Sequence, residues 1–137
     1  RKSAHRKALL TSLVTNLILQ SSIKTTLPKA KQARKAAEQI VTLARKGTLA
    51  ARRLAASRLQ SPTALQELFD RVVPSMDGRN GGYTRIMKLG QRRSDGSEMC
   101  ILQWVVLPVK VEAVAEPAPA PAAEEKKPAK KAAKAKA

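Results

Sequence analysis

Aromatic, cysteine and histidine residues are nearly absent from this sequence. Its 137 residues include one Trp, one Tyr, one Phe, one Cys and one His. Cys100 has no second thiol with which to form an internal disulfide or a metal clamp, and His5 alone cannot build a metal site or a triad. The scarcity of aromatic side chains also means that the core must be aliphatic. We therefore expect no metal, no cofactor and no redox chemistry.

Long apolar runs and acidic residues are scarce as well. No apolar run approaches the roughly 20 residues of a membrane-spanning helix, and the N-terminus lacks the uncharged core of a secretory signal. We expect a soluble chain with no membrane partner. Lys and Arg number 27 against 10 Asp and Glu, which gives a formal charge of +17. A chain with this charge needs a polyanionic partner, and nucleic acid is the predicted one.

The composition divides the chain near Leu107. Residues 1–107 carry 20 basic and 6 acidic side chains, whereas residues 108–137 are mostly Ala, Pro, Lys and Glu. Such a tail buries too little apolar surface to offset the entropy of ordering it. We predict one domain over residues 1–107 and a disordered low-complexity tail over 108–137. Because the first residue is Arg1 and not Met, we also expect basic sequence to precede it.

Apolar periodicity and turn residues predict four helices in the first domain. The first helix is predicted to start with Ser3 as its cap, and the second to start at Thr26 and Pro28 and to end at Gly47. The third starts at Thr48, and the fourth starts at Ser61 and Pro62 and ends at Pro74. The predicted core positions are Leu10, Leu13, Val14, Leu17 and Ile18 in the first helix; Ala30, Ala33, Ala37, Ile40, Val41 and Ala44 in the second; and Leu65, Leu68, Phe69, Val72 and Val73 in the fourth.

Three segments predict strands. Ile23–Thr26 is rich in β-branched residues, and Tyr83–Leu89 and Met99–Leu107 alternate with a period of two. The eight-residue segment "GQRRSDGS" suits an open hairpin loop between the last two strands. Cys100, Leu102, Trp104 and Val106 would share one face of the final strand. The predicted class is α/β, in the α+β sense: a small antiparallel three-stranded sheet packed with about four helices.

Cationic side chains concentrate where nucleic acid could bind. The hairpin segment Asp77–Gly96 contains five of them, more than a strand needs to cover a core. Each Lys or Arg that neutralises a phosphate releases counterions, Arg binds phosphate in a fork, and glycines let the backbone approach closely. The predicted RNA-binding residues are Arg1, Lys2, His5, Arg6, Lys7, Lys24, Thr25, Thr26, Lys29, Lys31, Arg34, Lys35, Arg52, Arg53, Arg58, Arg79, Asn80, Gly81, Gly82, Tyr83, Thr84, Arg85, Lys88, Arg92 and Arg93.

Several of these residues also fit a plainer interpretation. A cluster of arginines on a short helix can simply keep that helix solvated. Asn80, Gly81 and Gly82 suit an ordinary turn as well as a phosphate-approach loop, and no Gly-Lys-Ser/Thr follows them, so a nucleotide P-loop is excluded. Tyr83 fits a half-buried position at a sheet edge as well as stacking on an unpaired base.

Arg45 is predicted to join Lys31, Arg34 and Lys35 on the anion-facing side of its helix.

Four segments of this chain resemble a known family in their order and spacing. They are "IKTTLPKAKQARKAAEQIVTLARKG", "RRLAASRL", "LF" and "GGYTRIMKLGQRRSDGSEM". Together they look like the bacterial and organellar ribosomal protein seventeen of the large subunit, over Ser3 to Val105. The chain departs from the usual family pattern at Ser75 and Met76, where an Arg and an aromatic residue are common, and at Gln103, where an acidic residue is common.

The resemblance implies a structural role. It implies a compact domain bound to large-subunit ribosomal RNA near the exit of the nascent-peptide tunnel, beside neighbouring ribosomal proteins, with no catalytic activity and no small-molecule substrate. The implied location is the ribosome of the bacterial cytoplasm, with an organellar matrix as the alternative.

Two rival functions come from the residues alone. The tail "KKPAKKAAKAKA" is typical of non-specific DNA condensers. Asp77, Asp95 and Glu98 form a conceivable carboxylate set, but they have no partner His or nucleophile.

Overall fold

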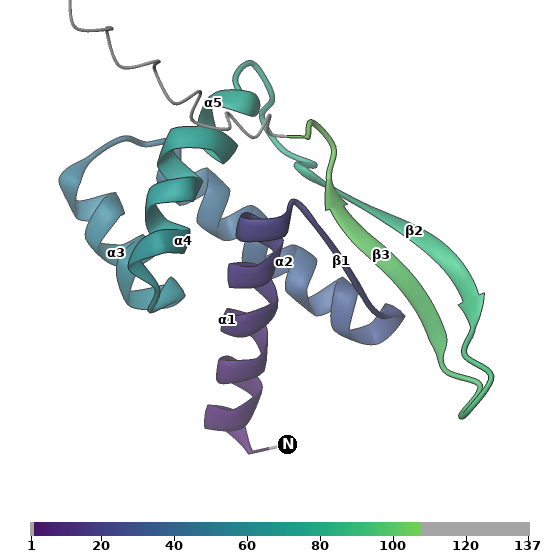
Figure 1. The fold of residues 1–137 in the computed structure, drawn as a ribbon. Coiled ribbons are helices and arrows are strands. Elements are labelled where there is room, and N and C mark those ends of the chain that lie inside the picture. The colour runs from purple at the N-terminus through teal and green to yellow at the C-terminus, as the bar shows by residue number, and fades with distance from the viewer. Residues whose placement is uncertain (1, 108–137) are drawn as a thin grey trace, which may run out of the picture.

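The computed structural model describes residues 2–107, so Arg1 and the predicted tail at 108–137 lie outside the described residues. The elements follow one another as α1 (Ser3–Gln20), β1 (Ser22–Thr26), α2 (Leu27–Ala44), α3 (Leu49–Leu59), α4 (Pro62–Glu67), a π-helical turn η1 (Leu68–Val72), α5 (Val73–Ser75), β2 (Thr84–Gln91) and β3 (Glu98–Trp104) (Figure 1). The predicted α+β class is confirmed.

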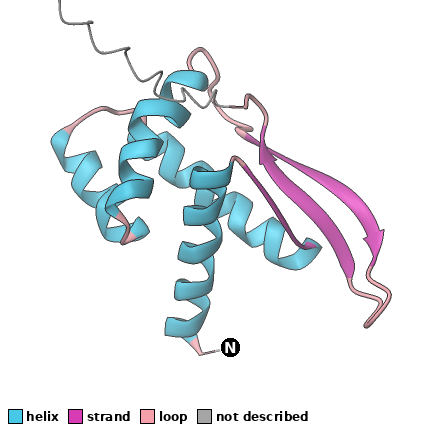
Figure 2. Ribbon diagram, viewed as in Figure 1, coloured by secondary structure: helices cyan, strands magenta, loops and turns pink. Residues whose placement is uncertain are grey.

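The three strands form one antiparallel sheet in the order β1-β3-β2. Figure 2 shows the helices gathered on one side of this sheet. Cys100, Leu102 and Trp104 of β3 are fully buried on the helix-facing side. Residues directly opposite one another in an antiparallel pair share a face. The register of β2 and β3 shifts between Lys88 and Gly90, which leaves Leu89 as a bulge in the outer strand.

The second helix forms the centre of the packing. The six predicted core positions of α2, at three- and four-residue steps, are all buried, and four of them are alanines. Pro28 stands in the first turn, where its missing N–H needs no partner. Thr48 caps α3 by accepting a hydrogen bond from the N–H of Ala51 at 3.2 Å, as its sequence position predicts. These features confirm the predicted helices between Pro28 and Leu59.

The sole tryptophan ties the sheet to the first helix. Trp104 is fully buried, and its Nε1 donates to the carbonyl oxygen of Leu17 at 3.0 Å. Cys100, its neighbour on the same face, directs Sγ to the carbonyl oxygen of Thr25 at 3.4 Å. Burial raises the pKa of the Cys100 thiol, which keeps it protonated and unreactive.

The structure corrects the predicted fourth helix. Helical conformation continues through Pro74 to Ser75, because Pro74 stands in the first turn of α5, where its missing N–H needs no partner. Helix α5 directly follows the π turn, in which the N–H of Val73 reaches back to the carbonyl of Leu68. The buried stripe consists of Ala64, Leu68, Val72 and Met76. The other predicted core positions, Leu65, Phe69 and Val73, are only partly buried beside it.

Smaller corrections concern element ends. Ser3 is the first residue of α1 and makes no capping bond, and Lys2 occupies the cap position. Strand β2 starts after Tyr83 and runs on to Gln91, while β3 ends at Trp104. Val106 consequently lies beyond the sheet and is exposed. No helix within residues 2–107 is both long and apolar enough to cross a membrane.

Candidate nucleic-acid interface

Most of the predicted contact residues lie at the surface. Thr26 is half-buried, and Thr25, Tyr83 and Thr84 are buried. The exposed ones are Lys2, His5, Arg6, Lys7, Lys24, Lys29, Lys31, Arg34, Lys35, Arg52, Arg53, Arg58, Arg79, Asn80, Gly81, Gly82, Arg85, Lys88, Arg92 and Arg93.

Three of the predicted contacts are buried in the protein, namely Thr25, Tyr83 and Thr84. Tyr83 is only 2% exposed, so its ring cannot stack on a base, and it belongs to the core, not to the edge of the sheet. Thr84 donates its hydroxyl to Oε1 of Glu38 at 3.2 Å. We leave these three residues out of the candidate interface because their polar atoms face protein partners or the interior.

Ion pairs engage few of the cationic side chains. Within residues 2–107 the ion pairs are Arg34 with Glu38, Arg71 with Glu67 and Arg92 with Asp95. Basic residues exceed acidic ones by 14 in residues 1–107, so most cations on this small domain have no carboxylate to neutralise them. Their repulsion is relieved most effectively by an external polyanion.

The cations of the β2–β3 hairpin are divided between the two faces of the sheet. Arg85 lies opposite Gln103, and Lys88 lies opposite Cys100. Cys100 points toward the helices, so Lys88 is on the helix side and Arg85 is on the outer side. Both are exposed because β2 is an edge strand. A single flat ligand on one face would therefore not meet both side chains, whereas a ligand that follows the edge of β2 would.

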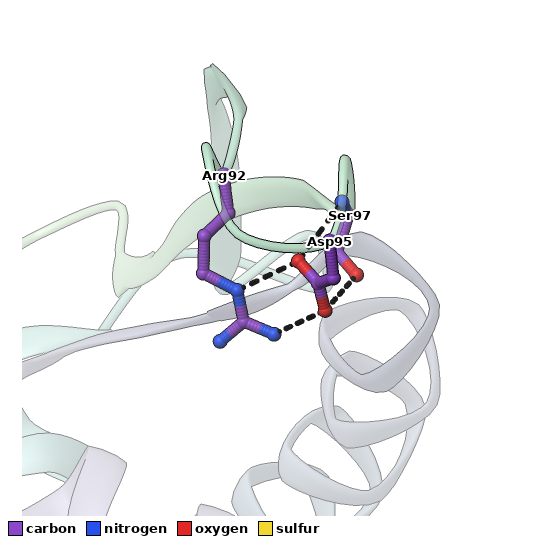
Figure 3. A network of polar contacts seen from close by, with 3 residues as sticks. All are labelled: Arg92, Asp95 and Ser97. Atoms are coloured by element: carbon purple, nitrogen blue, oxygen red, sulfur yellow. Dashed lines mark hydrogen bonds and ion pairs between the residues drawn. The ribbon is translucent and has the colours of Figure 1, made fainter.

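The tip of the hairpin is shaped by an internal network (Figure 3). Arg92 donates Nε and Nη2 to the two carboxylate oxygens of Asp95, at 2.9 and 2.6 Å. Ser97 adds its backbone N–H at 3.2 Å and its hydroxyl at 2.8 Å. The hydrogen bonds from Arg92, followed by those from Ser97, hold the pKa of Asp95 far below its usual range, and Asp95 in turn raises the pKa of Arg92. The Arg92 fork is thus already occupied, while neighbouring Arg93 is exposed.

The glycine-rich loop before β2 is held by Arg45, the residue that directly follows α2. Arg45 directs Nη1 to the backbone oxygen of Arg79, to Oδ1 of Asn80 at 3.3 Å and to the hydroxyl of Tyr83 at 3.0 Å. Arg45 was predicted to face an anion, but its guanidinium instead fixes this loop. Gly82 has a φ of +60°, which favours glycine. A Cβ there would meet no protein atom within 4 Å, so the loop is open to an approaching ligand.

The arginines of α3 differ in their surroundings. The guanidinium of Arg52 lies 4.7 Å from the ring centre of Phe69, a cation–π contact that anchors α3 to the adjoining helical segment. Arg53 is exposed, and Arg58 lies in the last turn of the helix. Lys46, which is not among the predicted contact residues, lies in the turn after α2 and shares a hollow with Arg58 and Lys35. Its position next to Arg45, directly before the helix-stop signal Gly47, was the signal that could have identified it.

Comparison with known proteins identifies the family of this chain. The family model described as "Ribosomal protein L17" matches residues 9–105. A protein of Alkaliphilus metalliredigens named "Large ribosomal subunit protein bL17" is 50% identical over 105 residues, which cover 77% of this chain and 93% of that protein.

Two further bacterial proteins carry the same name. The one from Methylacidiphilum infernorum is 48% identical over 112 residues, covering 82% of this chain and 86% of its own length. The one from Myxococcus xanthus is 47% identical over 126 residues, covering 92% of this chain and 91% of its own. The family match spans both α2 and the β2–β3 hairpin, and the chain belongs to the ribosomal protein L17 family.

Proposed function

We propose that this protein is a structural constituent of the large ribosomal subunit and binds large-subunit ribosomal RNA by charge neutralisation and shape fit. The observation that carries the proposal is the excess of cations without carboxylate partners on a small domain of the L17 family. RNA phosphates are the polyanion that such a surface suits, because each contact releases condensed counterions. Three curated relatives named as large-subunit proteins support this assignment.

The proposed contact surface has three parts. The first is the start of α1 with the exposed side of α2, the second is α3, and the third is the edge of β2 with the loop that precedes it. Gly81 and Gly82 are exposed and open to close approach. Arg45 contributes by fixing this loop, and Asp95 by fixing the hairpin tip.

The finer assignments rest on the family resemblance. We propose a location near the exit of the nascent-peptide tunnel, with neighbouring large-subunit proteins as further partners, no catalytic activity and no small-molecule substrate. Within residues 2–107, no three His, Cys, Asp or Glu side chains cluster in a way that could hold a metal. The bacterial relatives favour the ribosome of a bacterial cytoplasm over an organellar matrix.

The test compares two polyanions across a salt series. The full chain should bind large-subunit ribosomal RNA fragments more tightly than random duplex DNA at every salt concentration, and log affinity should fall linearly with log salt. Equal affinity for both nucleic acids throughout would favour a non-specific DNA condenser. A second readout is sedimentation of the protein with large subunits from cells, and normal assembly of those subunits without the protein would contradict the proposed role.

A further inference from the structure

Two adjoining hollows form a groove along α2. The first has a volume of about 570 Å³ and is lined by α2 residues, by Lys46 in the turn after α2 and by Arg58 of α3. The second has a volume of about 460 Å³ and lies where α1, α2 and α3 meet. Gln39 and Arg58 line both hollows, so the two are continuous. We call this feature the α2 groove.

The α2 groove is cationic along its length. Lys35, Lys46 and Arg58 line the first hollow, and Lys7 and Arg58 line the second. In the part of the chain that the structure describes, none of these four side chains is in an ion pair. Their charges are therefore available to an external anion.

The single carboxylate of the groove is already neutralised. Glu38 lines the first hollow, but its Oε1 accepts Nε of Arg34 at 3.1 Å and the hydroxyl of Thr84 at 3.2 Å. Both donors lie outside the set of side chains that line the groove. Glu38 consequently does not cancel the charge of Lys35, Lys46 or Arg58.

The spacing of the groove cations suits an extended polyanion. From Lys35 the helix runs about 14 Å further to its last residue, Ala44, and Lys46 lies two residues beyond that end, in the turn that follows α2. Gln39 and Thr42 line the groove between Lys35 and Lys46. A single carboxylate or free phosphate could reach only one end of such a row, whereas a nucleic-acid strand carries a charge every few ångströms.

We propose that the α2 groove binds the phosphodiester backbone of one RNA segment, with Lys35, Lys46 and Arg58 contacting successive phosphates and Gln39 lying against the strand. The proposal rests on the proposed function, since it assigns a defined site to RNA on this protein. It is separate from the hairpin, because every lining residue of the groove comes from α1, α2 or α3, or is Lys46 in the turn after α2 or Gln60 directly after α3.

The experiment uses the full chain and charge-matched variants. Lys35→Gln/Lys46→Gln/Arg58→Gln removes three charges from the groove, and Lys130→Gln/Lys131→Gln/Lys134→Gln removes three from the tail. Glutamine keeps helix propensity close to that of Lys and Arg, and circular dichroism checks that both variants fold. Binding to large-subunit ribosomal RNA fragments is then measured from 50 to 400 mM salt.

The groove variant should lower the magnitude of the log–log salt slope by about 2 to 3, the value for three lost phosphate contacts, and the tail variant should lower it by less. In addition, a photo-crosslinking amino acid at position 39 should attach to ribosomal RNA in assembled large subunits. A groove variant with the wild-type slope, or crosslinks from position 39 to protein only, would overturn the groove proposal. If the wild-type chain itself shows no preference for ribosomal RNA, the proposed function fails, irrespective of the groove.

Discussion

Arg45, at the end of α2, donates a hydrogen bond from Nη1 to the hydroxyl of the buried Tyr83, at 3.0 Å. The same nitrogen reaches Asn80, so a helix end, a glycine-rich loop and the residue before β2 are joined at one guanidinium. Residues 38 positions apart in the sequence are thereby held together. The candidate RNA loop is shaped before any ligand arrives, which lowers the ordering cost of binding.

Replacing either partner should destabilise the domain. Tyr83→Phe removes one hydrogen bond and should lower the free energy of unfolding by about 1 kcal/mol, and Arg45→Gln, which removes several, by about 1 to 2 kcal/mol. The double variant should cost less than the sum of the two, since both changes break the same contact. Urea unfolding measures all three values. Lys46→Gln, an exposed neighbour, should be neutral, and strictly additive losses would contradict the coupling.

Arg85 and Lys88 lie on opposite faces of the hairpin, so substituting each one separately shows where RNA contacts the sheet. We expect Arg85→Gln and Lys88→Gln each to reduce the salt slope of RNA binding by about 0.7 to 0.9, because a strand that follows the edge of β2 meets both. Neither change should alter the melting temperature, as both side chains are exposed. An effect of Arg85→Gln alone would indicate instead that RNA lies on the outer face of the sheet.

Acid should loosen the hairpin tip. Arg92 and Ser97 hold the pKa of Asp95 below its value in the unfolded chain. Their hydrogen bonds therefore stabilise the hairpin tip fully above the ordinary carboxyl pKa, and this stabilisation is lost as pH falls through the folded-state pKa. Carboxyl NMR titration should give Asp95 a midpoint below the ordinary range, and Arg92→Gln should raise that midpoint. Hydrogen exchange at the Ser97 amide should accelerate in Arg92→Gln, while global stability stays unchanged because the tip is exposed. An unshifted midpoint in that variant would contradict the assignment of Arg92 as the main cause.

The bond between Trp104 and Leu17 should be a major contribution to stability. Trp104→Ala should cost about 3 to 5 kcal/mol through the cavity that it leaves, and Trp104→Phe should cost about 1 to 3 kcal/mol, since it removes the Nε1 donor and part of the ring. Far-UV circular dichroism in urea measures both changes. Leu107→Ala is the control, because that side chain is 59% exposed and should matter little. Equal stability of Trp104→Phe and wild type would show that the hydrogen bond makes no net contribution.

Removing residues 108–137 should leave the domain folded and able to join large subunits. The deletion takes away a small net charge of +3, while residues 1–107 carry +14. The triple substitution in the α2 groove also removes three charges, but from proposed phosphate contacts on the folded domain, so we expect RNA affinity at moderate salt to fall far less after the deletion. Sucrose-gradient sedimentation of cells that express the shortened chain measures incorporation, and exclusion of that chain from the subunit would identify the tail as a functional arm.

Local signals predicted the helices well where spacing and punctuation agreed. The buried positions of α2 follow from its three- and four-residue steps, and Thr48 caps α3 as its position indicates. Pro74 misled because a π turn changes the register before it, and neither periodicity nor residue type reveals such a turn. Element types were therefore predictable from local chemistry, while some of their ends were not.

The candidate site was predictable only in part. Exposed cations such as Arg85 and Lys35 follow from composition, because Lys and Arg rarely bury without partners. The opposite placement of Arg85 and Lys88 depends on strand register. The anchoring role of Arg45 and the meeting of Lys46 with Arg58 depend on tertiary packing. Tyr83 and Thr84 are buried because α2 covers this end of the sheet, which no nearby sequence feature specifies.

The four buried alanines of α2 have a consequence for the surface of the protein. Helices that meet through methyl groups approach more closely than helices that meet through larger side chains. Lys7, Lys35 and Arg58, from three different helices, line the same pair of hollows. A larger side chain at a buried alanine of α2 that faces α1 or α3 would push these helices apart and lower the positive charge density over the groove, so the size of interior side chains sets the charge density on the surface.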